Sequence, residues 1–155
     1  MAMRSSAVGK IITVLIIGAF VLFCWSVFFP HRYESTEVLS GEEAVNRSPI
    51  ALPDAASNVR VATYTHWVAY SQYVRFEAPT PVCLAHAKAM TGQEPPAPKA
   101  LDEDERRCFH LYFADGLPWF DTAHIRNGVV LGGGPSVPKV WVDTDRGIFY
   151  YQITD

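Results

Sequence analysis

The longest apolar run of the chain lies near its N-terminus, where residues 11–29 contain no charged side chain. At a rise of about 1.5 Å per residue, a helix of this length approaches the thickness of a hydrocarbon core, so the pattern predicts a transmembrane helix. A cleaved signal peptide is the alternative, but its apolar stretch is shorter and ends in small residues. Here the run ends in bulky residues at 28–29, and Leu22 and Phe23 before Cys24 argue against a lipoprotein site. We therefore expect an uncleaved helix.

The charges on either side of this run set its expected orientation. Arg4 and Lys10 precede it, whereas Arg32 is soon followed by Glu34. Because basic residues favour the cytoplasmic side of a membrane, residues 1–10 are expected in the cytoplasm. The chain would then be a single-pass protein of the cell membrane, with the lipid bilayer as one partner and its C-terminal domain in the periplasm or outside the cell.

A stretch without a sustained apolar period follows, over residues 30–57, and it contains acidic side chains and three prolines. This composition predicts a flexible linker that holds the folded domain about 30 Å from the membrane. Ser40 and Glu43 have the spacing of a capping box, which predicts a short helix inside the linker. A plain solvated stretch is the alternative at this point.

The patterns of a folded domain occupy residues 58–155. Apolar and polar residues alternate over 59–65 and again over 70–78, which predicts two antiparallel strands. A threonine and a proline at 80–81 supply an N-cap and a favoured first-turn proline, and Gly92 is suited to end the helix. A helix is therefore predicted between these signals.

The second half of the domain returns to strand patterns. Alternation predicts a strand over 108–114 and a weaker one over 125–131. Segments 140–143 and 148–154 flank a turn at 144–147, where aspartate and glycine favour a hairpin. The predicted fold class is α+β: an N-terminal transmembrane helix, then a small antiparallel-sheet domain with one main helix, in the order strand, strand, helix, strand, strand, hairpin.

Composition narrows the possible functions. Apolar residues make up 49% of the chain and charged residues 19%, which fits one helix and one folded domain better than a disordered chain. The formal charge of −3 argues against a nucleic-acid surface, because phosphate binding requires clustered cations. No sequence motif of a hydrolase, a phosphate-binding loop or covalent haem is present, so an enzyme is not favoured and no cofactor is predicted.

Two cysteines and two histidines form the sharpest chemical pattern. Cys83 and His86 share one face of the predicted helix, and Cys108 and His110 share one face of a predicted strand. Three outcomes stay open: a disulfide between the cysteines, unpaired buried thiols, or a metal site formed by all four side chains. The disulfide and the metal site both require the helix to cover the sheet face that carries Cys108. For His86 alone, a place in the core is favoured over a role as ligand or base.

Aromatic residues are the other conspicuous group. Both predicted sheet faces carry large apolar side chains, and one helix cannot cover both. Either irregular segments cover the second face, or this face docks a partner, since tyrosine and tryptophan are common in interfaces. The residues of this predicted interaction surface are Tyr64, Trp67, Tyr73, Tyr112, Trp119, Trp141 and Tyr150.

These patterns predict a membrane-anchored, non-catalytic interaction or assembly module outside the cytoplasm, which docks a protein partner through an aromatic sheet face. The alternative is a metal-binding or redox-active domain that uses Cys83, His86, Cys108 and His110. Segments 56–59, 74–79 and 141–151 resemble parts of small, single-span bacterial membrane proteins with an exported α+β domain. This resemblance implies no assigned activity and therefore no functional residue.

Overall fold

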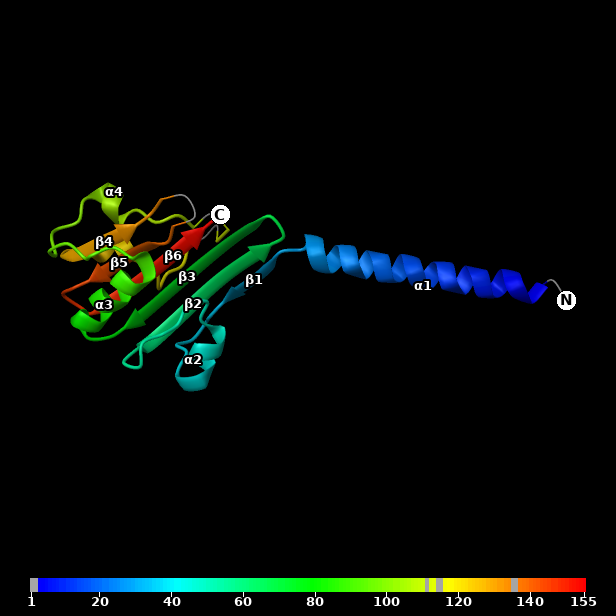
Figure 1. The fold of residues 1–155 in the computed structure, drawn as a ribbon, viewed down its shortest axis with the longest axis horizontal. Helices are drawn as coiled ribbons and strands as arrows, with labels where there is room; N and C mark the ends of the chain where they lie inside the picture. The colour runs from blue at the N-terminus through cyan, green and yellow to red at the C-terminus, as the bar shows by residue number, and fades with distance from the viewer. Residues whose placement is uncertain (1–2, 111, 114–115, 135–136) are drawn as a thin grey trace.

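A computed structural model describes residues 3–110, 112–113, 116–134 and 137–155. Six strands form one antiparallel sheet in the order β1-β2-β3-β6-β5-β4, so the predicted α+β class and antiparallel sheet are confirmed (Figure 1). The elements are α1 (Met3–Phe28), β1 (His31–Glu34), α2 (Gly41–Arg47), β2 (Ser57–His66), β3 (Ala69–Glu77), α3 (Thr80–Thr91), α4 (Glu103–Arg106), the 3-10 helix η1 (Thr122–His124), β4 (Gly128–Gly132), β5 (Lys139–Asp143) and β6 (Ile148–Thr154).

Helix α1 projects away from the sheet domain as an isolated rod (Figure 1). Within the described residues, no helix reaches both the length and the apolar composition that crossing a membrane requires. The predicted transmembrane helix over 11–29 is therefore wrong. The uncharged run did predict that a helix forms in this part of the chain, but it was not sufficient to make that helix a membrane span.

The region predicted to be a flexible linker, residues 30–57, is part of the folded domain. Strand β1 pairs with β2 in antiparallel register from His31 opposite Thr65 to Glu34 opposite Ala62. Helix α2 packs against β2 and buries Ala44. The linker prediction is wrong because short polar strands at a sheet edge have no apolar period, although their backbone groups are paired. Ser40 is the N-cap of α2, but its side chain makes no capping bond.

The predicted strand pair and helix in the first half of the domain are confirmed. β2 and β3 pair along most of their length, and β3 pairs on its other side with β6. Helix α3 begins after Pro79 and ends at Gly92, whose φ of 68° is the left-handed conformation that glycine adopts readily. The helix therefore follows the predicted signals, with its N-cap one residue earlier than expected.

The second half differs from prediction at one segment. Residues 108–110 and 112–113 form a loop and not the predicted strand, and Leu111 and Ala114 lie outside the described residues. β4 is shorter than the predicted 125–131 strand, and the β5–β6 hairpin matches its prediction closely. The alternation over 108–114 misled because Phe113 packs in the second core while Phe109, which the strand period would place on the same face, is exposed.

Two cores lie on opposite faces of the sheet. On the first face, α3 and α2 cover the strand residues, which include Val74, Val142 and Phe149. On the second face, residues of the described segments 101–110, 112–113 and 116–125 cover strand residues that include Tyr73 and Trp141. The structure thus shows the outcome in which irregular segments cover the second aromatic face.

Candidate functional site

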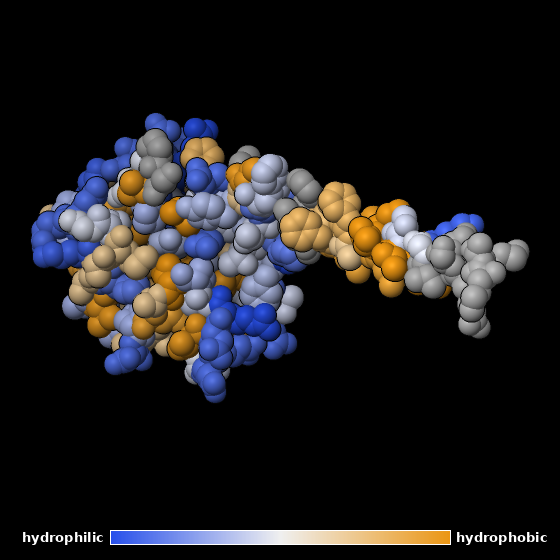
Figure 2. Space-filling view, turned by 45° about the vertical axis from the view of Figure 1, so that its right-hand side comes forward, coloured by the Kyte–Doolittle hydropathy of each residue, from blue (hydrophilic) through white to orange (hydrophobic). Residues whose placement is uncertain are grey.

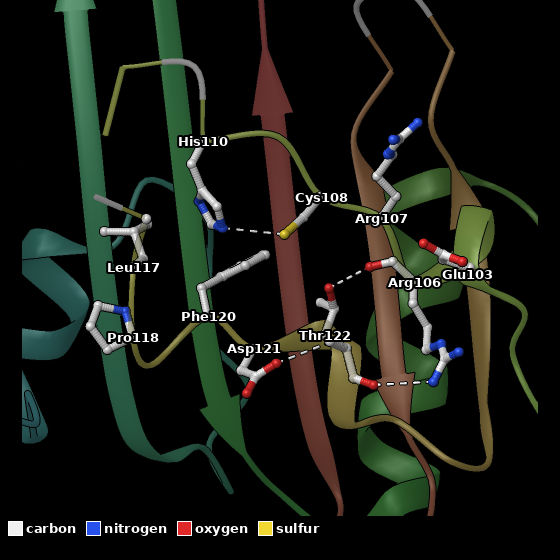
Figure 3. A pocket seen from close by; sticks show the side chains of 12 residues that line it. Glu103, Arg106, Arg107, Cys108, His110, Leu117, Pro118, Phe120, Asp121 and Thr122 are labelled. Carbon is white, nitrogen blue, oxygen red and sulfur yellow. Dashed lines mark hydrogen bonds between the residues drawn. The ribbon is translucent and has the colours of Figure 1, made fainter. Parts of the chain in front are cut away.

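Cys108 and His110 meet in the loop that follows α4. The Sγ atom of Cys108 lies 3.2 Å from Nε2 of His110, which is within hydrogen-bond reach for sulfur. Figure 3 shows the two side chains pointing toward one another across the wall of a cleft. The loop therefore brings together a nucleophilic thiol and an imidazole base.

The cleft beside this pair has a volume of about 550 Å³ and lies between the loop after α4 and the segment that leads to η1. One part of its wall is apolar, from Leu117 and Phe120, and another is charged, from Arg106 and Asp121. Such a mixture of an apolar wall and a few polar groups is typical of sites for small molecules or flexible chains.

Hydrogen bonds from neighbouring elements fix the loop that carries the pair. The Thr122 hydroxyl donates to the Arg106 carbonyl oxygen at 2.5 Å. Lys139 Nζ donates to the Arg107 carbonyl oxygen at 2.9 Å. The Phe109 carbonyl oxygen accepts hydrogen bonds from Tyr73 Oη and Gln152 Nε2. Because the backbone is held on both sides of Cys108, the thiol and the imidazole keep their relative position.

The His110 ring is held by aromatic neighbours. It lies against Tyr73, with ring centroids 5.5 Å apart, and meets the edge of Phe120 at 6.0 Å. Burial lowers the pKa of His110, which keeps the imidazole neutral at neutral pH. Its Nδ1 atom is buried and makes no hydrogen bond to the described part of the chain. This neutral ring is free to accept a proton at Nε2.

Burial also raises the pKa of the Cys108 thiol, although the charge of Lys139 acts in the opposite direction. The resting pair is therefore a protonated thiol beside a neutral imidazole, with Sγ and Nε2 3.2 Å apart. It is not a thiolate–imidazolium ion pair, so any reaction at the sulfur requires transfer of the thiol proton.

Cys83 and His86 lie in the first core, on α3. Cys83 is fully buried, its Sγ donates to the Ala78 carbonyl oxygen at 3.5 Å, and burial raises its pKa to about 11. His86 meets the edges of Phe76 and Phe149, and burial lowers its pKa. This placement matches the predicted core role of His86.

The predicted disulfide and four-residue metal site are not formed. Cys83 and Cys108 are free thiols and lie in the cores on opposite sides of the sheet. In the described ranges, no group of three or more His, Cys, Asp or Glu side chains converges as metal ligands do. The reason is that α3 covers the sheet face opposite the one where Cys108 packs, so the sheet separates Cys83 and His86 from Cys108 and His110.

The predicted aromatic interaction surface is largely interior. Tyr73, Trp141 and Tyr150 are buried in the second core and cannot contact a partner. The others lie nearer the surface: Tyr64 and Tyr112 stack on each other with centroids 4.0 Å apart, Trp119 is half-buried, and Trp67 is exposed at the tip of the β2–β3 hairpin.

A second cleft, of about 750 Å³, lies near Trp119 and holds several guanidinium groups. Arg75 pairs with Glu77 at 2.5 Å, and Arg146 pairs with Asp143 at 3.2 Å. Because internal carboxylates occupy these cations, the cleft offers less free positive charge than its arginines suggest.

The i, i+2 spacing of Cys108 and His110 predicted that the two side chains share one face, and a metal site, a disulfide and unpaired thiols were all open for them. Among the described residues, no third metal ligand lies beside this pair. No protein family, curated protein or solved structure matches this chain.

Proposed function

We propose that this protein is an interaction module that associates with lipid through α1 and presents its sheet domain to a protein partner. The observation that carries the proposal is the exposure of apolar side chains around α1. Its large apolar residues between positions 11 and 25 are 51–71% exposed, and Figure 2 shows hydrophobic residues along the helix outside the domain. Burying such a surface against lipid or a protein partner is favourable.

Lipid fits α1 better than a protein groove does. A helix that docks in a protein groove is usually apolar on one face and polar on the other. Between Ile11 and Trp25, however, apolar residues occur on all sides of the helix. A groove would therefore leave one apolar side of α1 exposed.

The domain retains a smaller exposed apolar feature that supports protein docking. Trp67 and Val68, at the tip of the β2–β3 hairpin, are 63% and 64% exposed. This tip lies at the end of the sheet where β1 starts, because His31 pairs with Thr65. Large aromatic side chains at an accessible tip are common anchors of protein interfaces.

Flotation of the full chain with phosphatidylcholine vesicles tests the lipid association. We expect the wild-type chain to rise with the vesicles in a density gradient. Ile16→Asp with Phe20→Asp should reduce the floated fraction at least tenfold, because an ionised carboxylate is unfavourable in an apolar environment.

Val45→Asp is the matched control, since Val45 is an exposed apolar residue of α2 within the domain. It should float like the wild type. The proposal is wrong if the wild-type chain stays with the protein fraction, or if the substitutions in α1 and in α2 have equal effects.

A further inference from the structure

We propose that Cys108 is a nucleophile with His110 as its general base, and that the adjoining cleft takes an activated ester or thioester whose acyl group is transferred to Cys108. This site is separate from α1, so the inference does not depend on lipid association. It rests on the 3.2 Å contact between Sγ and Nε2 and on the cleft that both side chains line (Figure 3).

The geometry suits transfer of a proton from sulfur to nitrogen. A general base must lie within hydrogen-bond reach of the proton that it removes, and His110 Nε2 meets this condition. The imidazole is held by Tyr73 and Phe120, and the loop backbone is fixed by Tyr73 and Gln152. The base is therefore positioned before a substrate arrives.

The charges around the pair make the thiol dependent on this base. Asp121 and Lys139 act on Cys108 with opposite signs, and Glu103 and Arg106 line the same cleft. Burial keeps the thiol protonated and the imidazole unprotonated. A thiol in this state is a weak nucleophile by itself, and a neighbouring neutral imidazole is the group that can accept its proton during attack.

The step is a transfer of an acyl group without any change of oxidation state. Sγ attacks the carbonyl carbon and forms the S–C bond while the thiol proton moves to Nε2 of His110. The bond from carbon to the leaving oxygen or sulfur then breaks, and the leaving group takes the proton from the imidazolium. The products are a thioester on Cys108 and a free alcohol or thiol. Leu117 and Phe120 provide an apolar wall for the acyl chain.

The experiment uses p-nitrophenyl acetate on the purified full chain at pH 7, with mass spectrometry of the cysteine-containing peptides. Buried Cys83 serves as an internal reference within the same molecule. We expect Cys108 to be acetylated at least tenfold faster than Cys83. His110→Phe should slow the acetylation of Cys108 by about 100-fold, within the usual range for loss of a general base.

His86→Phe is the matched control, because His86 is also a partly buried imidazole between aromatic rings but lies on the other face of the sheet. It should leave the Cys108 rate unchanged. Equal rates at Cys108 and Cys83, or an unchanged Cys108 rate in His110→Phe, would overturn the proposal. Near-ultraviolet circular dichroism reports whether each variant is folded.

The pH dependence of the wild-type rate tests the same inference without any substitution. If His110 is the base, the Cys108 rate should rise through an inflection below the ordinary imidazole pKa of 6.5 and then level off, because the folded pKa of His110 is lowered. A rate that instead climbs steadily into the alkaline range would show simple ionisation of the thiol and would contradict a role for His110.

Discussion

Trp141 joins the sheet to the loop that carries the candidate site. Its ring is fully buried in the second core, and its Nε1 donates to the Glu105 carbonyl oxygen at 2.7 Å. Glu105 in turn completes a capping box with Asp102 at the start of α4. The packing of one strand residue therefore fixes the element that precedes Cys108.

Trp141→Phe should lower the free energy of unfolding by about 2 kcal/mol, because the Glu105 carbonyl loses its donor and a small cavity forms. Urea unfolding of the two proteins, followed by far-ultraviolet circular dichroism, measures the difference. Trp67→Phe is the control at an exposed tip and should change stability by less than about 0.5 kcal/mol. Similar losses at the two positions would contradict the assigned place of Trp141 in the core.

At this scale the sequence predicted which side chains share a face but not what covers the face. Alternation correctly placed Trp141 opposite Val140 and Val142. It did not show that residues between 101 and 125 cover the aromatic face, because irregular segments have no regular alternation of apolar and polar residues. The spacing of Cys108 and His110 likewise predicted that the two side chains lie on the same side of the chain. Their contact, however, depends on the conformation of the loop, which the spacing does not determine.

Turns set the boundaries of the secondary-structure elements, and the glycines in them differ in what surrounds them. Gly147, in the β5–β6 turn, has a φ of 65°, and a Cβ there would lie 2.5 Å from the Ala78 carbonyl oxygen. Gly92, after α3, has a similar φ of 68° but open space around it. Alanine substitutions at the two glycines therefore distinguish the free-energy cost of a left-handed backbone from the additional cost of a steric clash.

Gly92→Ala should destabilise the domain by about 1 kcal/mol, from the left-handed backbone alone. Gly147→Ala should cost at least about twice as much, because the added methyl group also displaces the backbone at Ala78. Thermal unfolding of both variants, compared with the wild type, checks the order. A larger loss at Gly92 would contradict the close approach at Gly147.

Elements with strong local signals were predictable, and elements defined by tertiary pairing were not. The aspartate–glycine turn and the proline–glycine limits of α3 are local chemistry, so they could be read directly. β1 has only four residues, mostly polar, and its pairing with β2 becomes visible only when the sheet is assembled. The same limit explains why residues 30–57 were predicted to be a linker.

At the scale of the whole molecule, α1 and the sheet domain have different requirements. The domain has two cores of its own, on the two faces of the sheet, and α1 contributes to neither among the described side chains. The apolar surface of α1 lies outside the domain (Figure 2). Solubility and folding are therefore expected to depend on different parts of the chain.

A chain of residues 30–155 should fold without α1 and stay monodisperse in the absence of detergent, because it keeps both cores and all six strands. Its free energy of unfolding should lie within about 1 kcal/mol of the value for the full chain in micelles. Size-exclusion chromatography and urea unfolding measure these two properties. Failure of this shorter chain to fold would show that α1 is part of the domain.

The short step from α1 to β1 also determines how a mechanical load would pass through the molecule. Only Phe29 and Pro30 separate the end of the helix from the first paired residue of the sheet. Helix α1 extends beyond the N-terminal end of β1, so a force along α1 pulls on that end of the strand (Figure 1). The hydrogen bonds between β1 and β2 are perpendicular to the strands. This force would shear all the β1–β2 hydrogen bonds at the same time. Because only two residues connect α1 to β1, a force on the helix would be transmitted directly to the sheet.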